Sequence, residues 1–452
     1  MRKVSGWYLF ALNAYWIGLG FMWNSLHVTI LPAVLLNYVP ADKKNTWLGL
    51  LTFFGLILAM VIQPLAGAVS DRWAGRLGRR RPFIWFGTLV SLVFLCLLAF
   101  VGGLPALFIG YIGLQVFSNI ANGPMLGWLP DEVPAEQLGM ASGVKTVADM
   151  IGVILSSVLM GFLISGQNAD PRKSILTILT FVAVFAAITL LGGRERVAVV
   201  VRPPVVQWKS LWKEVFNFKA EGDRNYWRLI FSRFLYLVGI YGFQSFAQYF
   251  IRDRFPNQDP ILFIQLVMGI FVVVLISVSL LSGYLGDHYG RKRMHILSGV
   301  VGAVGAVLLI FARTPLQLIL FSCFMGIGLG LFMTTNWAMA NQMAPASEAG
   351  KYMGLTNLAT AGSGAIARLE GPMIDGFNNA AAGAFWGWTA MFVVPPSSCW
   401  LPAWPCVTSP IPVSNPPPNS SNPPAWACPN RNVSAPMGGL YSNLCSPSPN
   451  KH

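Results

Sequence analysis

The segment Gly67–Ile84 has the sequence GAVSDRWAGRLGRRRPFI, and it decides how the rest of the chain is interpreted. It contains five arginines and one aspartate, whereas the stretches on both sides of it are apolar and almost free of charge. Clusters of Lys and Arg between apolar stretches are typical of the cytoplasmic loops of membrane proteins. The segment is therefore predicted to be a cytoplasmic turn that joins two membrane-spanning helices.

The composition of the whole chain also indicates an integral membrane protein. Of its 452 residues, 54% are hydrophobic and 11% are charged, whereas about a quarter of the residues of a soluble domain are charged. A helix needs roughly 20 apolar residues to cross a bilayer. Twelve spans are predicted, the last of them short, at about residues 7–37, 46–68, 83–102, 105–128, 138–165, 174–192, 227–250, 262–285, 294–312, 316–340, 352–377 and 381–394. The net charge of +14 does not indicate a nucleic-acid partner, because the basic residues are placed in short loops between these spans.

Arginine and lysine are distributed unevenly between alternate loops, and this gives the orientation of the spans. One set of loops carries the arginines of 67–84, a basic stretch over 193–226 and Arg291–Arg293, whereas the opposite set carries fewer. The first set is predicted to be cytoplasmic, so we expect a multi-pass protein of the cell membrane with a cytoplasmic N-terminus. Residues 1–192 are expected to form an N-terminal six-helix bundle, 193–226 a cytoplasmic linker and 227–394 a C-terminal helical bundle.

The two halves of the chain repeat two motifs in register. The first repeat matches Gly67, Asp71 and Gly78-Arg79-Arg80-Arg81 with Gly283, Asp287 and Gly290-Arg291-Lys292-Arg293. The second matches PDEVPAEQLGMASG at 130–143 with NQMAPASEAGKYMG at 341–354, with Pro134 and Pro345 separated by 211 residues. Parallel repeats of six spans occur in one large class of secondary transporters. The expected fold is therefore an all-α integral membrane protein of two six-helix bundles related by pseudo-two-fold symmetry, with the last helix truncated.

The repeated loop resembles the signature loop of the major facilitator superfamily, which has the pattern G-x-x-x-D-r-x-G-R-[RK]-[RK]. The longer first copy, DRWAGRLGRRRPFI at residues 71–84, resembles the version found in the glycoside–pentoside–hexuronide and sucrose-type branch. The resemblance covers about residues 5–394. It implies two bundles that rock about a central cleft, with the repeated loops as gates on the cytoplasmic side.

The chemistry of these loops is compatible with a gate. A carboxylate such as Asp71 at a helix end can accept hydrogen bonds from the exposed N–H groups of a neighbouring helix N-terminus. The arginines can pair with acidic residues of adjoining loops, namely Asp131, Glu132 and Glu136. The candidate gate residues are Gly67, Asp71, Arg72, Gly78, Arg79 and Arg80 in the first copy and Gly283, Asp287, Gly290, Arg291 and Lys292 in the second. The alternative is that the arginines only anchor the topology.

Polar residues inside the spans are the candidates for a solute pathway, because burying them in a membrane is costly. The candidates are Asn24, Gln115, Asn119, Asn122, Tyr241, Gln244, Gln248, Asn336 and Trp337. They lie on spans 1, 4, 7 and 10, which the resemblance implies line the central cavity. Amides donate and accept hydrogen bonds and aromatic rings stack on sugar C–H faces, so this set suits a neutral polyhydroxyl solute. The alternative is that these residues join helices by hydrogen bonds.

Two pairs of charged residues inside the spans are candidates for coupling transport to a proton or cation. Lys145 and Asp149 lie four residues apart, so they share one helix face and can form an ion pair. Arg368 and Glu370 lie two residues apart, so they do not face each other on one helix and need other partners. The alternative for either pair is a permanent structural role.

The sequence changes character after residue 394. From Pro395 it is rich in proline, serine and asparagine, and it contains Cys399, Cys406, Cys428 and Cys445. Such a stretch cannot continue a membrane helix, and its cysteine spacings match no metal site. We expect residues 395–452 to be a disordered, aberrant tail that replaces most of the last helix; an oxidised disulfide module or a zinc site is the alternative.

These features favour a secondary active transporter that takes up a sugar, a glycoside or a similar small organic solute together with a proton or a monovalent cation. An exporter of drug-like molecules or metabolites from the same superfamily is the alternative, and a non-transporting membrane sensor is an alternative of a different class. The sequence has no H-E-x-x-H, G-x-S-x-G or G-x-x-x-x-G-K-[ST] motif, so a membrane enzyme is not expected. No cofactor and no metal are expected.

Overall fold

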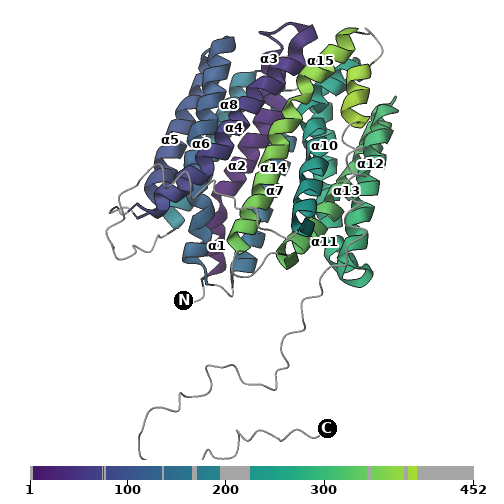
Figure 1. The fold of residues 1–452 in the computed structure, drawn as a ribbon. Coiled ribbons are helices and arrows are strands. Elements are labelled where there is room, and N and C mark those ends of the chain that lie inside the picture. Colours follow the sequence, from purple (N-terminus) through teal and green to yellow (C-terminus); the bar gives the residue numbers. More distant parts are fainter. Residues whose placement is uncertain are drawn as a thin grey trace, which may run out of the picture. The chain divides into compact units, whose positions relative to one another are not determined.

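The computed structural model describes residues 4–73, 75, 78–134, 137–164, 170–193, 224–343, 349–380 and 385–393. These residues form helices joined by short connections, and no β-strand occurs among them (Figure 1). The expected all-α fold is therefore confirmed. Nearly all of the predicted linker 193–226 and the whole predicted tail 395–452 lie outside the described residues, as do Arg76, Glu136 and Pro345.

The first half of the chain contains the first six spans. The first is divided into α1 (Gly6–Asn13), α2 (Tyr15–Asn24), the π-helical turn η1 (Ser25–Ile30) and α3 (Leu31–Leu35). The others are α4 (Lys44–Asp71), which follows the short η2 (Ala41–Lys43), α5 (Arg81–Phe100), α6 (Leu104–Glu132), α7 (Leu138–Ile164) and α8 (Pro171–Gly192). Each span is a long apolar run, and Pro begins or nearly begins α5, α6 and α8, where its missing N–H costs nothing.

The second half repeats this arrangement. Its helices are α10 (Arg224–Arg254), α11 (Pro260–Tyr289), α12 (Arg291–Ile310), α13 (Pro315–Met343), α14 (Ala349–Arg368) and α15 (Glu370–Ala380), and residues 386–393 are also helical. The span predicted over 352–377 is thus two helices, α14 and α15, separated at Leu369. Pro372 has no N–H to donate to the carbonyl of Arg368, which accounts for the break.

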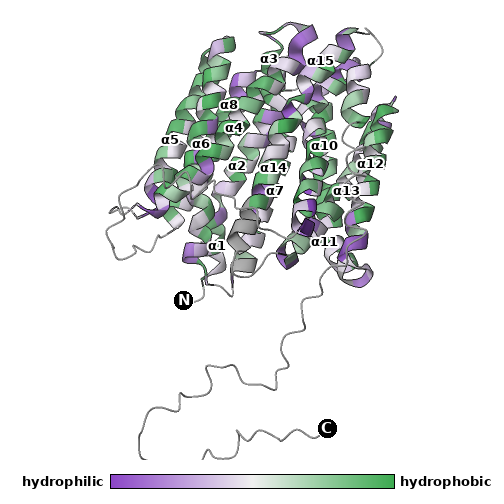
Figure 2. Ribbon diagram, in the orientation of Figure 1, coloured by the Kyte–Doolittle hydropathy of each residue, from purple (hydrophilic) through white to green (hydrophobic). Residues whose placement is uncertain are grey.

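The hydropathy of the helices fits a protein that crosses a membrane several times. Ten helical segments are long and apolar enough to span a bilayer by length and composition, with α1–α3 counted as one segment. Figure 2 shows that apolar residues dominate the middle of the helices and that hydrophilic residues gather toward their ends. The outward faces carry large exposed hydrophobic side chains such as Phe162 and Leu280, which suits contact with lipid.

The two halves meet along two seams. Within the first half, α2 packs on α7 and α8, and α6 packs on α4 and α5; within the second, α13 packs on α11 and α12, and α10 packs on α14. Two seams join the halves. In one, α7 packs on α11; in the other, α4 packs on α14 and α15. The repeat matches α4 with α11 and α7 with α14, so it maps one seam onto the other. This exchange is the pattern that pseudo-two-fold symmetry produces.

The two signature loops also agree in backbone conformation. Gly78 has φ 97° and Gly290 has φ 90°, and each directly precedes the basic residues that begin the next helix. A positive φ of this kind is accessible to glycine and strained for other residues. The glycine at this point of both motifs is therefore required by the turn itself.

Candidate functional site

A cavity of about 470 Å³ lies between the two halves of the helical bundle. Side chains from α2, η1, α6 and α7 of the first half and from α10 and α14 of the second line it. Six of the candidate site residues from the sequence are among them: Asn24, Asn122, Asp149, Tyr241, Gln244 and Arg368. The cavity has the size and the mixed lining that are typical of a small-molecule site.

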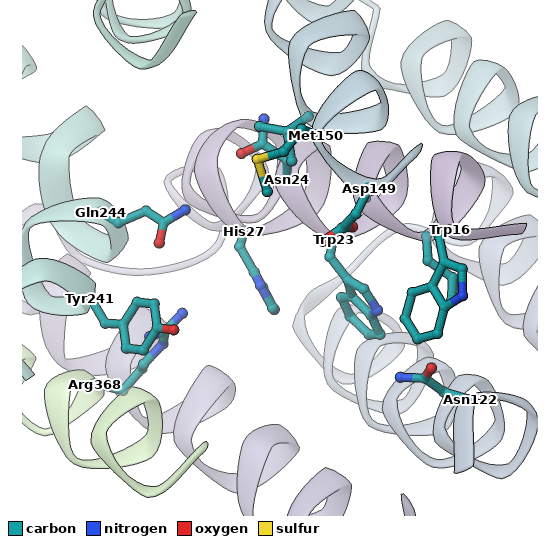
Figure 3. Close-up of a pocket in the computed structure, with 13 residues that line it drawn as sticks. Trp16, Trp23, Asn24, His27, Asn122, Asp149, Met150, Tyr241, Gln244 and Arg368 are labelled. Atoms are coloured by element: carbon teal, nitrogen blue, oxygen red, sulfur yellow. The ribbon is translucent and has the colours of Figure 1, made fainter. Parts of the chain in front are cut away.

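The two sides of the cavity differ in chemistry. Figure 3 shows Trp16, Trp23 and Asp149 on one side and Tyr241, Gln244 and Arg368 on the other. The first side offers indole rings and a carboxylate, and the second offers a phenol, an amide and a guanidinium. A solute in the cavity would therefore meet an acidic group of the first half and a basic group of the second.

His27 lies between these two sides in Figure 3. Its ring stacks on Trp23 with centroids 5.2 Å apart, and its Nε2 is 3.0 Å from the hydroxyl oxygen of Tyr111. The π-helical turn η1 carries His27, and a turn of this type adds a residue to the helix and often marks a functional site.

Three predicted pathway residues form hydrogen bonds inside or between helices and do not line the cavity. Gln115 donates to the Tyr111 hydroxyl at 2.7 Å, and Asn119 donates to the Gln115 carbonyl at 2.8 Å, both within α6. Gln248, with its amide in the orientation that satisfies both of its atoms, donates to the carbonyls of Val28 and Thr29 at 2.9 and 3.1 Å. Gln248 therefore joins α10 to η1, whereas Gln115 and Asn119 bond within α6.

Asn336 and Trp337 of α13 also do not line the cavity. Asn336 Oδ1 accepts a hydrogen bond of 2.7 Å from the buried Arg233, whose guanidinium lies 4.8 Å from the centroid of the Trp337 ring. Arg233 also donates to Thr360 Oγ1 at 2.8 Å, so it joins α10, α13 and α14. Arg233 was not among the residues predicted from the sequence, although an arginine inside an otherwise apolar span was the available signal.

Lys145 and Asp149 do not form the ion pair that their spacing allows. The Lys145 ammonium instead lies 3.8 Å from the centroid of the Trp16 ring, a cation–π contact with another helix. The Asp149 carboxylate lines the cavity and packs on the backbone of α2 at Gly20, where a Cβ would lie 2.7 Å from Asp149 Oδ1. Lys145 therefore contacts Trp16, and it makes no ion pair with Asp149.

Arg368 and Glu370 are both buried, and they do not pair with each other in the described part of the chain. Arg368 Nη1 donates to the Gly364 carbonyl at 3.0 Å, while its Nε has no hydrogen-bond partner among the described residues. Glu370 lies against Gly242 of α10, and its Oε2 also has no partner there. Of the two residues, only Arg368 lines the cavity.

The first signature loop is held by ion pairs within its own half. Arg79 Nη2 lies 2.6 Å from Asp131 Oδ2, and Arg80 pairs with Asp131 and, at 2.7 Å, with Asp71. The expected contact with Asp131 is present, whereas Asp71 pairs with Arg80 in place of a helix N-terminus. Arg72 donates to the Ala68 carbonyl at 2.9 Å. Gly67 packs on Gly123 of α6.

The backbone of the second signature loop joins α11 to α12. Asp287 lies near the end of α11, and Gly290 begins the turn to α12, which starts with Arg291 and Lys292. A Cβ atom added to Gly283 would have no neighbour within 4 Å outside its own helix turn. The side chain of Asp287 lies outside the described part of the structure.

Trp16 and Trp23 were not predicted as site residues from the sequence. Both line the cavity, and they lie seven residues apart on the first span, so they share one helix face. This spacing was the available signal. It was not decisive, because tryptophans at helical spacing on an apolar span also occur in ordinary packing.

Comparisons with known proteins agree with this architecture. The family model described as MFS/sugar transport protein matches residues 6–368. The multi-drug resistance efflux pump PmrA of Streptococcus pneumoniae is 24% identical over 368 residues, which cover 78% of this chain and 85% of that protein. Human solute carrier family 45 member 3 is 40% identical over 80 residues, which cover 18% of this chain and 14% of that protein.

Solved structures with the same fold are also similar to the chain. A D-xylose–proton symporter has a TM-score of 0.62 at 17% identity, over 87% of this chain and 96% of that one. A mutant of the nucleoside transporter NupG has a TM-score of 0.67 at 15% identity, over 88% of this chain and 99% of that one. At these identities the likeness shows the fold.

Proposed function

The chain belongs to the MFS/sugar transport protein family, and from this premise we propose that it is a secondary active transporter that works by alternating access. Its solute is a sugar, a glycoside or a similar small organic molecule. The observation that carries this proposal is the cavity of about 470 Å³ between two repeated halves, lined by polar side chains from both. A site shared by two bundles changes shape when the bundles rock.

The lining of the cavity supports a polyhydroxyl solute. The indoles of Trp16 and Trp23 give flat apolar surfaces for the C–H face of a sugar ring. Asn24, Asn122 and Gln244 can each donate and accept hydrogen bonds, as hydroxyl groups require. Arg368 and Asp149 on opposite sides would fix the orientation of the solute.

For coupling, we propose that Asp149 carries the proton or the monovalent cation. It is the one carboxylate that lines the cavity among the described residues, and the nearby Lys145 contacts the Trp16 ring. Movement of Lys145 from Trp16 to Asp149 would displace the bound cation, because an ammonium and a cation compete for one carboxylate. Arg368 and Glu370 remain candidates for the same exchange at the other side.

For the gates and the orientation, we propose that the two signature loops close the cytoplasmic side, with the N-terminus in the cytoplasm of the cell. The ion pairs of Arg79 and Arg80 with Asp131 and Asp71 support a loop of fixed shape at this end. Such a loop can meet the corresponding part of the other half when that side closes.

The experiment is uptake by the full chain reconstituted in lipid vesicles, with radiolabelled sucrose, D-xylose and a panel of glycosides. An inward proton gradient is expected to drive accumulation above the outside concentration, and a protonophore is expected to abolish it. Asp149→Asn keeps the size of the side chain and removes the charge, so it should lose gradient-driven accumulation while the protein stays folded. Uptake that persists after every ion gradient is collapsed would exclude symport.

An exporter of drug-like molecules is the second candidate, and one observation favours it. The efflux pump PmrA is similar to this chain over 78% of its length. Vesicles with an opposite gradient would then accumulate a cationic dye and none of the sugars. This outcome would replace the sugar proposal and keep the alternating-access mechanism.

A further inference from the structure

The two halves are joined by several bonds at the end of the bundle opposite the signature loops. α4 begins at Lys44 and ends at Asp71 beside the first signature loop, so Lys44 lies about 40 Å along the helix from that loop. At the Lys44 end, Lys44 pairs with Asp253, Asn379 donates to the Asp42 carbonyl at 2.9 Å, and Tyr249 donates to the Pro32 carbonyl at 2.8 Å. Each of these bonds links the first half to the second.

Asp375 of α15 makes the densest of these connections. Its Oδ1 accepts a hydrogen bond of 2.7 Å from Asn45 Nδ2. Its Oδ2 accepts from the Thr46 backbone N at 2.6 Å and from Thr46 Oγ1 at 2.7 Å. Asp375 is buried, so these donors replace its water shell.

These bonds place Asp375 as the N-terminal cap of α4. The first-turn N–H groups of a helix have no acceptor within the helix, and a negative charge there is favourable. α4 has no capping side chain of its own, because the residue at its cap position is Lys43, which makes no such bond. A helix of the first half therefore receives its cap from a helix of the second.

The backbone of α4 also lies close to the end of α14 and to α15. The Cα of Gly49 abuts the Arg368 carbonyl, and the Cα of Gly371 abuts the Asn45 carbonyl, with no room for a Cβ at either glycine. The Arg368 carbonyl is the one that Pro372 leaves without a helical donor. α15 thus rests on α4, and α14 packs on both α10 and α4.

The break at Leu369 separates the cavity from this contact. Arg368, the last residue of α14, lines the cavity, and Asp375 lies in α15 beyond the break. α15 can therefore change its angle relative to α14 at Leu369, because the helical hydrogen bonds are already interrupted there. A movement of α15 would release the three donors of α4 together.

We propose that Asp375 is a positioning residue of the transport cycle: with Asn45 and Thr46 it forms a latch that holds α15 on the N-terminus of α4 and keeps the end opposite the signature loops closed. The role in a cycle rests on the proposed function of alternating access. When this end opens, Asp375 leaves α4 and its three donors turn to water. When it closes, the buried carboxylate recovers them.

Hydrogen–deuterium exchange of the full chain in lipid nanodiscs, without any solute, tests the latch. Asp375→Asn removes the charge and leaves one carbonyl oxygen for three donors. We expect the first-turn amides of α4, Thr46 included, and the amides of α15 to exchange at least about tenfold faster. We also expect changed exchange around Arg79–Arg81, about 40 Å away, because an open latch shifts the protein toward the conformation closed at the signature loops.

Asp259→Asn is the matched control. Asp259 caps α11 by accepting from Ile261 N at 2.9 Å and Leu262 N at 3.1 Å, so the substitution removes a cap within one half. Its effect should stay in the first turn of α11. If Asp375→Asn changed only the amides of α4 and α15, the latch would be a local cap and the proposal would be overturned.

A second variant covers the case in which Asp375→Asn does not fold. Asn45→Ala combined with Thr46→Ala removes two of the three donors and keeps the carboxylate and the Thr46 N–H. It should give the same pattern at both ends, with a smaller increase at α4. An absence of sugar uptake would contradict the proposed function and leave the exchange result unaffected, because exchange is measured without solute.

Discussion

At the scale of single residues, the cavity depends on side chains that reach it from several helices. Trp23 lines the cavity and stacks on the His27 ring, whereas Trp7, near the start of α1, is 71% exposed. The two tryptophans therefore offer a comparison between an indole that meets solute and an indole that meets lipid or solvent.

Trp23→Ala is expected to weaken solute affinity about fivefold, because an aromatic stacking partner is worth roughly 1 kcal/mol beyond its buried area. The measurement is the KM of gradient-driven uptake for the sugar that the panel identifies. Trp7→Ala should leave KM unchanged. Equal KM values for both variants and the unmodified protein would show that the indole of Trp23 does not contact the solute.

Which polar residues face the cavity could be predicted only in part. Asn24, Asn122, Tyr241 and Gln244, predicted because they are polar residues inside the spans, do line the cavity. Gln248 finds its partners in the carbonyls of η1, which its own helix does not reveal. The spacing of Lys145 and Asp149 likewise fixed their face but could not show that Trp16 takes the lysine.

At the scale of helices, close packing is concentrated at a few glycines. Gly123 of α6 faces α4, where a Cβ would lie 2.9 Å from the Gly67 nitrogen and would also meet the Gln63 carbonyl. Gly143 of α7 has nothing within 4 Å of its Cβ position. The same substitution should therefore have opposite effects at the two positions.

Gly123→Ala is expected to destabilise the protein by about 1–3 kcal/mol, since backbone atoms cannot move aside for the new methyl group. Gly143→Ala should stabilise it by up to about 1 kcal/mol, because alanine is the better helix former. Thermal unfolding in detergent measures both. A fall in melting temperature of similar size for the two variants would contradict the role given to the α4–α6 contact.

The helices themselves were largely predictable, because long apolar runs bounded by charge or proline leave few alternatives. Two predicted spans are divided in the structure: 7–37 into α1, α2, η1 and α3, and 352–377 at Leu369. Pro372 was visible in the sequence, yet a proline in a membrane span can also produce a kink without ending the helix. In the structure the helix ends here, where Pro372 leaves the Arg368 carbonyl without a helical donor.

At the scale of the whole molecule, both signature loops should lie on the same side of the membrane. Trp73 and Tyr289 are exposed at the first and second loops, and Tyr38 and Phe311 are exposed at the connections of the opposite end. Each can be replaced by cysteine in a chain whose own cysteines are changed to serine.

An impermeant maleimide is expected to label Trp73→Cys and Tyr289→Cys only from the cytoplasmic face, as the positive charge of both loops requires. Tyr38→Cys and Phe311→Cys should react only from the outer face. Mass spectrometry of sealed and permeabilised cells gives the labelled fractions. Labelling of the two loops from opposite faces would contradict the repeat and, with it, the pairing of the two seams.

The exchange of the two seams under the repeat has a consequence for protein engineering. A symmetric protein made by fusing two copies of the first half would need each copy's α4 to dock on the α7 of the other. The repeat spacing of 211 residues places Met160 where Gly371 stands in the second half. A thioether chain would then press on the Asn45 carbonyl, so such a duplicated design would need glycine at position 160 before its two copies could dock.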